Sequence, residues 1–303
     1  MAIVLGPNQY GKAEIRLVHV AKDGGQHRLR DLTVGVTLTG DMADAHLTGD
    51  NSAVLPTDTQ KNTVYAFAAE YGVGGIESFA ARLARHFVTS QDSIATARVQ
   101  VAEHPWDPVA GTGHSFARRG GETRTAEVTC DGTATWAVSG LAGLVLLNSA
   151  GSEFHGYIKD RYTTLAETTD RILATEVTAR WRHMAVPPDG GGLRAESRPE
   201  EYGWDTSHAE ARRHLIEAFA QTHSKSLQQT LYAMGSRVLD HRPEVAEVRL
   251  TMPNKHHFVV ELSHFFIKNP NNSGTVLYAA DRPYGLIEGT VLRDDAPPAG
   301  LAW

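Results

Sequence analysis

The stretch Lys12-Ala-Glu-Ile-Arg-Leu-Val-His-Val20 decides the class of fold, because its side chains alternate in character along the chain. One side carries Ala13, Ile15, Leu17 and His19, and the other carries Lys12, Glu14 and Arg16. A period of two is typical of a half-buried β-strand. The pattern therefore predicts a strand over 12–20, with Lys12 at its start and on the face opposite Ile15.

The residues that follow this strand contain a turn signal and two helical patterns. The turn signal at 23–25 precedes a second expected strand over 31–39. Helical spacing follows over 59–70, and after the glycine-rich break 72–75 it recurs at Ile76, Phe79, Ala80, Leu83 and Phe87. Three more strands are expected, over 97–101, 123–129 and 135–147.

The second half of the chain predicts a similar order. It comprises a strand over 175–183, a Pro/Gly-rich loop over 187–192, two helices, and strands over 245–252 and 257–262. The second helix places Leu227, Leu231, Met234 and Val238 on one face. A short echo, 62–66 against 229–233, favours duplication. Strands joined by hairpins, with helices grouped between pairs of strands, predict an α+β fold with mainly antiparallel sheet.

Composition excludes several classes of protein. The 303 residues are 41% apolar and 21% charged, typical of a folded globular chain. A formal charge of -6 supplies no basic field for nucleic acid, and no run approaches the roughly 20 apolar residues of a membrane span. Cys130 is the only cysteine, which excludes an internal disulfide. The lack of a secretory signal and of a peroxisomal tripeptide at Leu301-Ala-Trp303 favours the cytoplasm.

Common cofactor and metal signatures are absent from the sequence. The glycine runs at 72–75 and 190–192 lack the phosphate-loop pattern, and no Gly-x-Ser-x-Gly elbow occurs. The densest histidine cluster is Lys255-His256-His257 with His264. Adjacent residues of a strand point to opposite faces, so His256 and His257 are not expected to share one ion. We expect no protein-bound metal.

Two segments are typical of helix starts. Thr57 is spaced as a cap with Gln60 three residues later, and Ser226 is spaced in the same way with Gln229. The structural interpretation is simple capping. A helix start also presents unpaired backbone N–H groups that suit an anion, so a binding role is compatible with it.

Together these stretches resemble the urate oxidase family, whose motifs appear in order. They are Tyr10-Gly-Lys12, Thr57-Asp58 through Lys61-Asn-Thr63, Gly151-Ser-Glu-Phe154, Tyr162-Thr-Thr-Leu165, Asp170-Arg-Ile-Leu173 and Pro253-Asn-Lys-His256. The resemblance implies the tunnelling fold, with repeats over 1–133 and 134–293 and a tail over 294–303. It also implies a homotetramer with active sites at subunit interfaces, where Lys12, Thr57 and Asp58 come from one chain and the other ligand-binding residues from a neighbour. The tail, with Pro297-Pro298, is expected to be loosely ordered or docked on a neighbour.

The resemblance assigns a substrate grip. Phe154 would stack on the purine, and Arg171 and Gln228 would hold its edge. Backbone N–H groups of Asp58 and Leu227 would complete the cradle. These residue types suit the task, because an aromatic face matches a flat heterocycle and a guanidinium offers paired donors.

The resemblance also assigns the chemistry. Lys12, Thr57 and His256 would form a proton relay, and Asn254 with Thr57 would hold O2 and then the attacking water. The relay requires Lys12 to give up its charge, which partial burial and a nearby cation favour. Electron-rich urate can itself reduce O2, so neither metal nor flavin is expected, and the implied products are 5-hydroxyisourate and H2O2.

Two other functions remain open on the sequence. One is a zinc-dependent tunnelling-fold enzyme of the pterin pathway, which the lone Cys130 disfavours. The other is a catalytically inactive purine-binding oligomer, which the retention of Lys12, Thr57, Asn254 and His256 disfavours.

Overall fold

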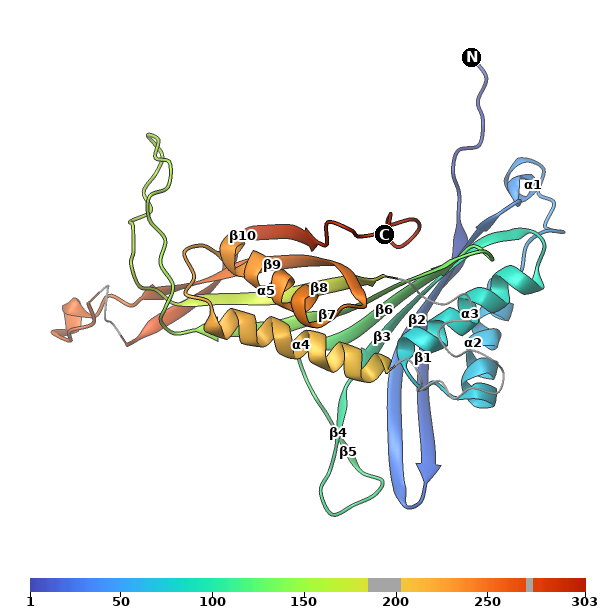
Figure 1. Ribbon diagram of the computed structural model, residues 1–303, viewed down its shortest axis with the longest axis horizontal. Helices are drawn as coiled ribbons and strands as arrows, with labels where there is room; N and C mark the ends of the chain where they lie inside the picture. Colours follow the sequence, from blue (N-terminus) through green and yellow to red (C-terminus); the bar gives the residue numbers. More distant parts are fainter. Residues whose placement is uncertain (185–202, 271–274) are drawn as a thin grey trace. The chain divides into compact units, whose positions relative to one another are not determined.

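The computed structural model describes residues 1–184, 203–270 and 275–303, so the expected loop over 187–192 lies outside the described residues. The chain divides into two compact units (Figure 1). Unit 1 comprises residues 1–140, 181–208 and 296–303, and unit 2 comprises 141–180 and 209–295. Each unit is antiparallel sheet with helices, which is the α+β class that the sequence predicts.

The strands of unit 1 follow one another in the order β1 (Tyr10–Asp23), β2 (Gln26–Gly40), β3 (Ile94–His104) and β6 (Thr123–Cys130), with the first part of β7 (Thr135–Asn148) next. The pairings from β1 to β6 are antiparallel. Gly24 and Gly25 connect β1 to β2 with φ of 58° and 82°, as a two-residue hairpin turn requires. The strands expected in this region are confirmed, each with longer bounds.

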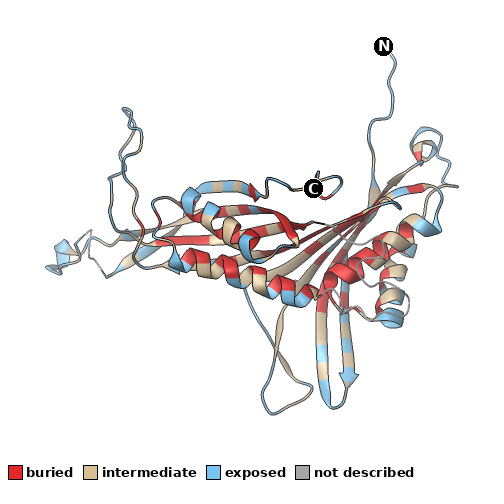
Figure 2. Ribbon diagram, viewed as in Figure 1, coloured by how far each residue is buried: buried red, intermediate tan, exposed pale blue. Residues whose placement is uncertain are grey.

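The helices of unit 1 are the short α1 (Ala43–Leu47), then α2 (Thr57–Tyr71) and α3 (Ile76–Ser90). The apolar face of α3 packs on β3 and β6, and Phe79, Leu83 and Phe87 are fully buried there. Figure 2 shows this buried stripe along α3. The predicted break between α2 and α3 is confirmed, with Gly72 and Gly74 at positive φ. A two-stranded arm of β4 (Trp106–Pro108) and β5 (Phe116–Arg118) was not predicted.

The strands of unit 2 are the rest of β7, most of β8 (Leu173–His183), β9 (Val245–Val259) and β10 (Leu277–Leu292), in that order. The short 3-10 helix η1 (Ser263–Phe265) follows β9. Two strand expectations were wrong here. The segments 245–252 and 257–262 were predicted as separate strands, but β9 runs without a break from 245 to 259. Strand β10 was not predicted.

Helix α4 (Trp204–Gln221) begins in unit 1 and continues into unit 2, which also contains α5 (Leu227–His241). The predicted apolar face of α5 packs on β9 and β10. A Cβ added to Gly235 would lie 2.6 Å from Val291, so helix and strand approach closely there. Among the helices of the described residues, none is long and apolar enough to cross a bilayer.

The order of strands and helices in the first half of the chain is similar to the order in the second half. Two strands, a helix pair and two further long strands occur as β1, β2, α2, α3, β3, β6 and again as β7, β8, α4, α5, β9, β10. The sequence echo does not mark equivalent places, because 62–66 lies in α2, the first helix of its pair, and 229–233 lies in α5, the second. The repeat bounds 1–133 and 134–293 therefore stay a prediction, supported by element order rather than by the echo.

The C-terminal tail differs from its expectation. Residues 296–303 belong to unit 1, and Ala302 is buried. A Cβ added to Gly300 would lie 2.3 Å from Nε1 of Trp136. The tail therefore packs on its own chain.

Candidate active site

Lys12 lies at a β-bulge that changes the face of the sheet on which it sits. Lys12 pairs with Val36 and Ile15 pairs with Val34, so two residues of β1 oppose one of β2 between these pairs, and Glu14 there has φ of 57°. Residues paired across two strands share a face, and Val34 and Val36 are both buried under the helices. Lys12 therefore lies on the same face as Ile15. The predicted opposite face was wrong, because the bulge inserts one residue into the alternation.

Thr57 begins α2 but does not cap it. The cap position belongs to Pro56, and Thr57 is the first helical residue. The predicted capping box is wrong as well, because Gln60 is fully buried and donates from Nε2 to the Leu55 carbonyl at 3.3 Å. Within the described residues the Thr57 hydroxyl forms no hydrogen bond, so it is available to a ligand. The helical ladder starts at Gln60 N–H, which leaves the N–H groups of Thr57 and Asp58 ahead of it.

Lys12 acts electrostatically on this helix start. The Asp58 carboxylate accepts hydrogen bonds from Lys61 and, at 3.1 Å, from Asn62. The bond from Lys61 is the main reason that the pKa of Asp58 lies below its usual range, and the charge of Lys12 adds to the effect. The Lys12 ammonium forms no hydrogen bond or ion pair within the described ranges. Unit 1 thus brings Lys12, Thr57 and Asp58 to one place.

A backbone ladder in unit 2 carries Phe154 and Arg171. The Phe154 N–H donates to the Thr168 carbonyl and the Arg171 N–H donates to the Ser152 carbonyl, both at 2.8 Å. On the other side, Glu153 N–H donates to the Ser224 carbonyl at 2.8 Å, two residues before the α5 cap. Three separate segments are therefore fixed together, and each carries part of the motifs.

The Arg171 guanidinium lies over the Phe154 ring, 5.1 Å from its centroid. In the part of the chain that the structure describes, Arg171 forms no ion pair with the nearby acidic residues Asp170 and Glu167. Asp170 instead accepts from the Gly151 N–H, and Glu167 pairs with Lys159. Burial lowers the pKa of Arg171, and a guanidinium still keeps its charge. Arg171 is thus a half-buried cation beside an aromatic ring.

The Phe154 ring is half-buried rather than part of the core. It stacks on Tyr157 with centroids 4.9 Å apart and planes at 16°. Tyr157 and Arg171 therefore both lie against the Phe154 ring. A purine that stacks on this ring must either lie beside one of them or displace it.

The start of α5 matches its prediction. The Ser226 side chain caps the helix by accepting from the Gln229 N–H at 3.2 Å, and Gln229 in turn accepts from the Lys225 N–H at 2.8 Å. Leu227 is buried at the first helical position and Gln228 is exposed beside it. The N–H groups of Leu227 and Gln228 come before the first helical bond, from Thr230 to Ser226, and suit an anion.

Asn254 and His256 lie two residues apart on β9 and so share a face. Their partners on β10 are Gly285 and Ala280, so β10 bulges opposite Lys255. Burial lowers the pKa of His256, and Arg171 and His257 lower it further, which favours the neutral imidazole near pH 7. A neutral imidazole can accept a proton.

The histidine pair on β9 and the lone Cys130 are the residues that bear on metal binding. His256 and His257 both lie within β9 and therefore face opposite sides. In the part of the chain that the structure describes, no group of three or more His, Cys, Asp or Glu side chains is arranged to hold a metal ion. Cys130 is buried in the core of unit 1.

Comparison with known proteins decides the family. The uricase family profile matches residues 8–129 and 137–288. A uricase of Arthrobacter globiformis is 47% identical over 301 residues, covering 99% of this chain and 94% of that protein. The chain belongs to the uricase family. A uricase of Danio rerio is 33% identical over 294 residues, covering 94% of this chain and 93% of the relative. The crystal structure of the A. globiformis uricase matches with a TM-score of 0.89 at 46% identity, covering 98% of each chain.

This match agrees with the expected uricase fold, the tunnelling fold.

The predicted residues of the uricase site fall into two groups. Unit 1 contains Lys12, Thr57 and Asp58, and unit 2 contains Phe154, Arg171, Leu227, Gln228, Asn254 and His256. The sequence reasoning missed the roles of Ser152 and Ser224, which are fully buried and join the ladder of unit 2. The adjacency of Ser152 to the Glu-Phe pair in one motif was the available signal.

Proposed function

We propose that this chain is a urate oxidase, which oxidises urate with O2 and water to 5-hydroxyisourate and H2O2 in purine degradation. The observation that carries the proposal is the Arg171 guanidinium over the Phe154 ring, on a ladder fixed to the start of α5. A flat anionic heterocycle needs an aromatic face, a forked cation and N–H donors, and these groups supply all three. Gln228 adds an acceptor and a donor for an imide-like edge.

In the proposed chemistry, the substrate itself transfers electrons to O2, and no side chain or cofactor carries them. Urate gives two electrons to O2, which leaves as H2O2 after taking up protons, and a water oxygen bonds to the ring carbon of the product. Lys12, Thr57 and His256 relay the protons, and the neutral imidazole favoured at His256 suits this role. Asn254 with Thr57 holds O2 and then water. The protein supplies orientation and proton transfer, without metal or flavin.

We further propose a cytoplasmic homotetramer with active sites between subunits. Large apolar side chains stand exposed on two segments of unit 2. They are Ile158, Tyr162 and Leu165 on one segment, and Phe265, Phe266 and Ile267 on the other. Clustered exposed apolar groups are typical of surfaces that another chain covers. This supports an oligomer and does not fix its order.

An oxygen electrode tests the proposed reaction. Purified protein is dialysed against a chelator, urate is added, and O2 uptake and H2O2 are measured together. We expect one O2 consumed and one H2O2 formed for each urate, at a rate equal to that of undialysed protein. Urate binding without O2 uptake would indicate a binding protein, and loss of the rate on chelation with recovery on added zinc would indicate a zinc enzyme.

A further inference from the structure

We propose that Tyr10 is a positioning residue for the reaction, because its hydroxyl fixes the strand that carries Lys12 to the backbone that leads into Thr57. The inference rests on the proposed roles of Lys12 and Thr57. It concerns unit 1 only, and Tyr10 itself touches neither substrate nor product in this assignment.

The contact is a two-way hydrogen bond to one residue. The Tyr10 hydroxyl donates to the Leu55 carbonyl at 3.1 Å and accepts from the Leu55 N–H at 3.0 Å. Burial raises the pKa of Tyr10, so the hydroxyl keeps the proton that it donates. The Gln60 amide also donates to the Leu55 carbonyl. Both backbone groups of Leu55 are thus occupied.

The chain between this contact and Thr57 has little freedom. Only Pro56 intervenes, and its ring fixes φ, here at −54°. Tyr10 and Leu55 both pack against the core of unit 1, so the contact lies on a rigid base. The position of Leu55 therefore determines where the Thr57 hydroxyl lies.

The chain between Tyr10 and Lys12 is equally constrained. Gly11 lies so close to β2 that an added Cβ would be 1.8 Å from the Val36 carbonyl oxygen. Lys12 itself pairs with Val36, immediately before the bulge. One hydroxyl thus joins two short segments of fixed geometry, and each segment ends in a residue of the proposed relay.

Proton transfer between two side chains depends steeply on their separation. Most of the proposed substrate grip, namely Arg171, Gln228 and the Leu227 N–H, belongs to unit 2, and only the Asp58 N–H lies on the segment that Tyr10 fixes. The test variant is Tyr10→Phe. The matched control is Tyr65→Phe, because the Tyr65 hydroxyl donates to the Arg16 carbonyl at 3.1 Å and also joins α2 to β1, but two turns beyond Thr57. Steady-state urate oxidation is measured in H2O and D2O, with thermal unfolding of each protein.

We expect Tyr10→Phe to lower kcat roughly tenfold, to keep KM within about twofold, and to increase the solvent isotope effect on kcat. Tyr65→Phe should leave all three unchanged. Equal kinetics in the two variants would overturn the proposal, as would a loss of activity in Tyr10→Phe that matches its loss of folded protein.

A second variant covers the case in which Tyr10→Phe does not fold. Gln60→Met removes the other donor on the Leu55 carbonyl and keeps the buried volume. It should lower kcat by about threefold at unchanged KM, and wild-type turnover would overturn the positioning role. Lys12→Met separates this inference from the proposed function. Full turnover in Lys12→Met would refute the relay and with it the role of Tyr10, whereas an inactive Lys12→Met beside a fully active Tyr10→Phe would refute Tyr10 alone.

Discussion

Lys12 and His256 both lie where the ladder of the sheet is irregular. Lys12 precedes a bulge in its own strand, and His256 and Asn254 flank the place where β10 bulges away from β9. A bulge re-aims side chains and frees backbone groups, which is why bulges are common beside active sites. Lys12 is therefore aimed by a bulge in its own strand, whereas His256 keeps the regular alternation of β9 and lies beside a bulge of the neighbouring strand.

Replacing Lys12 with Met should lower kcat by about a hundredfold or more, because a general base that acts in the transition state is lost. KM should stay within about twofold, since Lys12 is not part of the grip. Stopped-flow or steady-state urate oxidation measures both constants. Lys22→Met, an exposed lysine of the same strand, is the matched control and should behave as wild type. An unchanged turnover number for Lys12→Met would refute the relay.

Local motifs predicted the role of a single residue well only where that role depends on residues adjacent in sequence, and not on contacts with another element. The Ser226 cap is confirmed, because a cap depends on only four consecutive positions, here 226–229. Thr57 has the same local spacing, but Pro56 takes the cap and Gln60 turns into the core instead. The face of Lys12 was wrong because the bulge depends on pairing with β2, which alternation in one strand cannot show.

At the scale of elements, the β1–β2 hairpin depends on one close approach. Gly11→Ala should destabilise the protein by about 1–3 kcal/mol or more, because the new methyl group would overlap the Val36 carbonyl oxygen. Thermal unfolding measures the effect. Gly35→Ala on the facing strand is the control, since its Cβ would meet nothing closer than 3.7 Å. Similar melting temperatures for the two variants would show that β1 can shift, and would also weaken the argument that Gly11 fixes Lys12.

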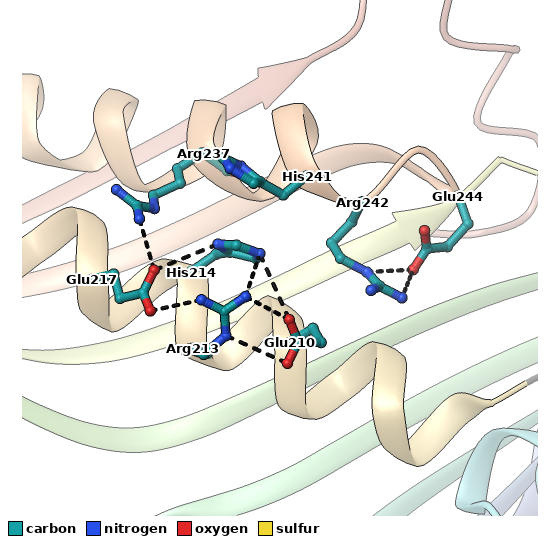
Figure 3. A network of polar contacts seen from close by, with 8 residues as sticks. All are labelled: Glu210, Arg213, His214, Glu217, Arg237, His241, Arg242 and Glu244. Carbon is teal, nitrogen blue, oxygen red and sulfur yellow. Dashed lines mark hydrogen bonds and ion pairs between the residues drawn. The ribbon is translucent and has the colours of Figure 1, made fainter.

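The helix pair of unit 2 contains a histidine stack surrounded by charges (Figure 3). His214 of α4 stacks on His241 of α5 with centroids 4.3 Å apart. The charged groups around it are Glu210, Arg213 and Glu217 on α4, Arg237 on α5, and Arg242 and Glu244 after α5. Burial lowers the pKa of His214, and Arg213 and His241 lower it further, against smaller opposite effects of the two carboxylates of α4.

This stack predicts acid sensitivity of the helix pair. The folded pKa of His214 is below its ordinary value of 6.5, so the unfolded chain takes up the proton first as pH falls. Its contribution to stability is complete above about pH 6.5 and is lost as the pH falls from there through the folded pKa. Melting temperatures from about pH 8 to about pH 5 should show the gap between wild type and His214→Gln narrowing with acid. His46→Gln, an exposed site, should show no such trend, and a constant gap for His214→Gln would contradict the prediction.

Element prediction succeeded where the hydrophobic period is regular and failed where turn residues interrupt it. The spacing of α3 and α5 follows the buried face of each helix, and both are confirmed. Strand β10 was missed because Asp281-Arg-Pro283 and Gly285 break its alternation and mimic a turn. The first of the two strands predicted in place of β9 ended at Met252, directly before Pro253, but β9 continues through this proline.

At the scale of the whole molecule, the proposed site draws on two units of the chain. Lys12, Thr57 and Asp58 belong to unit 1, and Arg171 with the remaining grip belongs to unit 2. The proposal of sites between subunits requires that each complete site takes unit 1 from one chain and unit 2 from another. A mutation in either unit then damages a site that two chains share.

Mixing two defective variants tests this arrangement. Lys12→Met and Arg171→Ala are unfolded together, refolded at equal amounts and assayed at low urate, where Arg171→Ala has little activity because its grip is lost. A site between chains is intact when its unit 1 comes from the Arg171→Ala chain and its unit 2 from the Lys12→Met chain. Random assembly gives each condition a probability of about one half, so roughly a quarter of wild-type activity should return. Each variant refolded alone is the control. Activity no higher than the average of the two controls would mean that one chain builds the whole site, and the tetramer would then have no part in the chemistry.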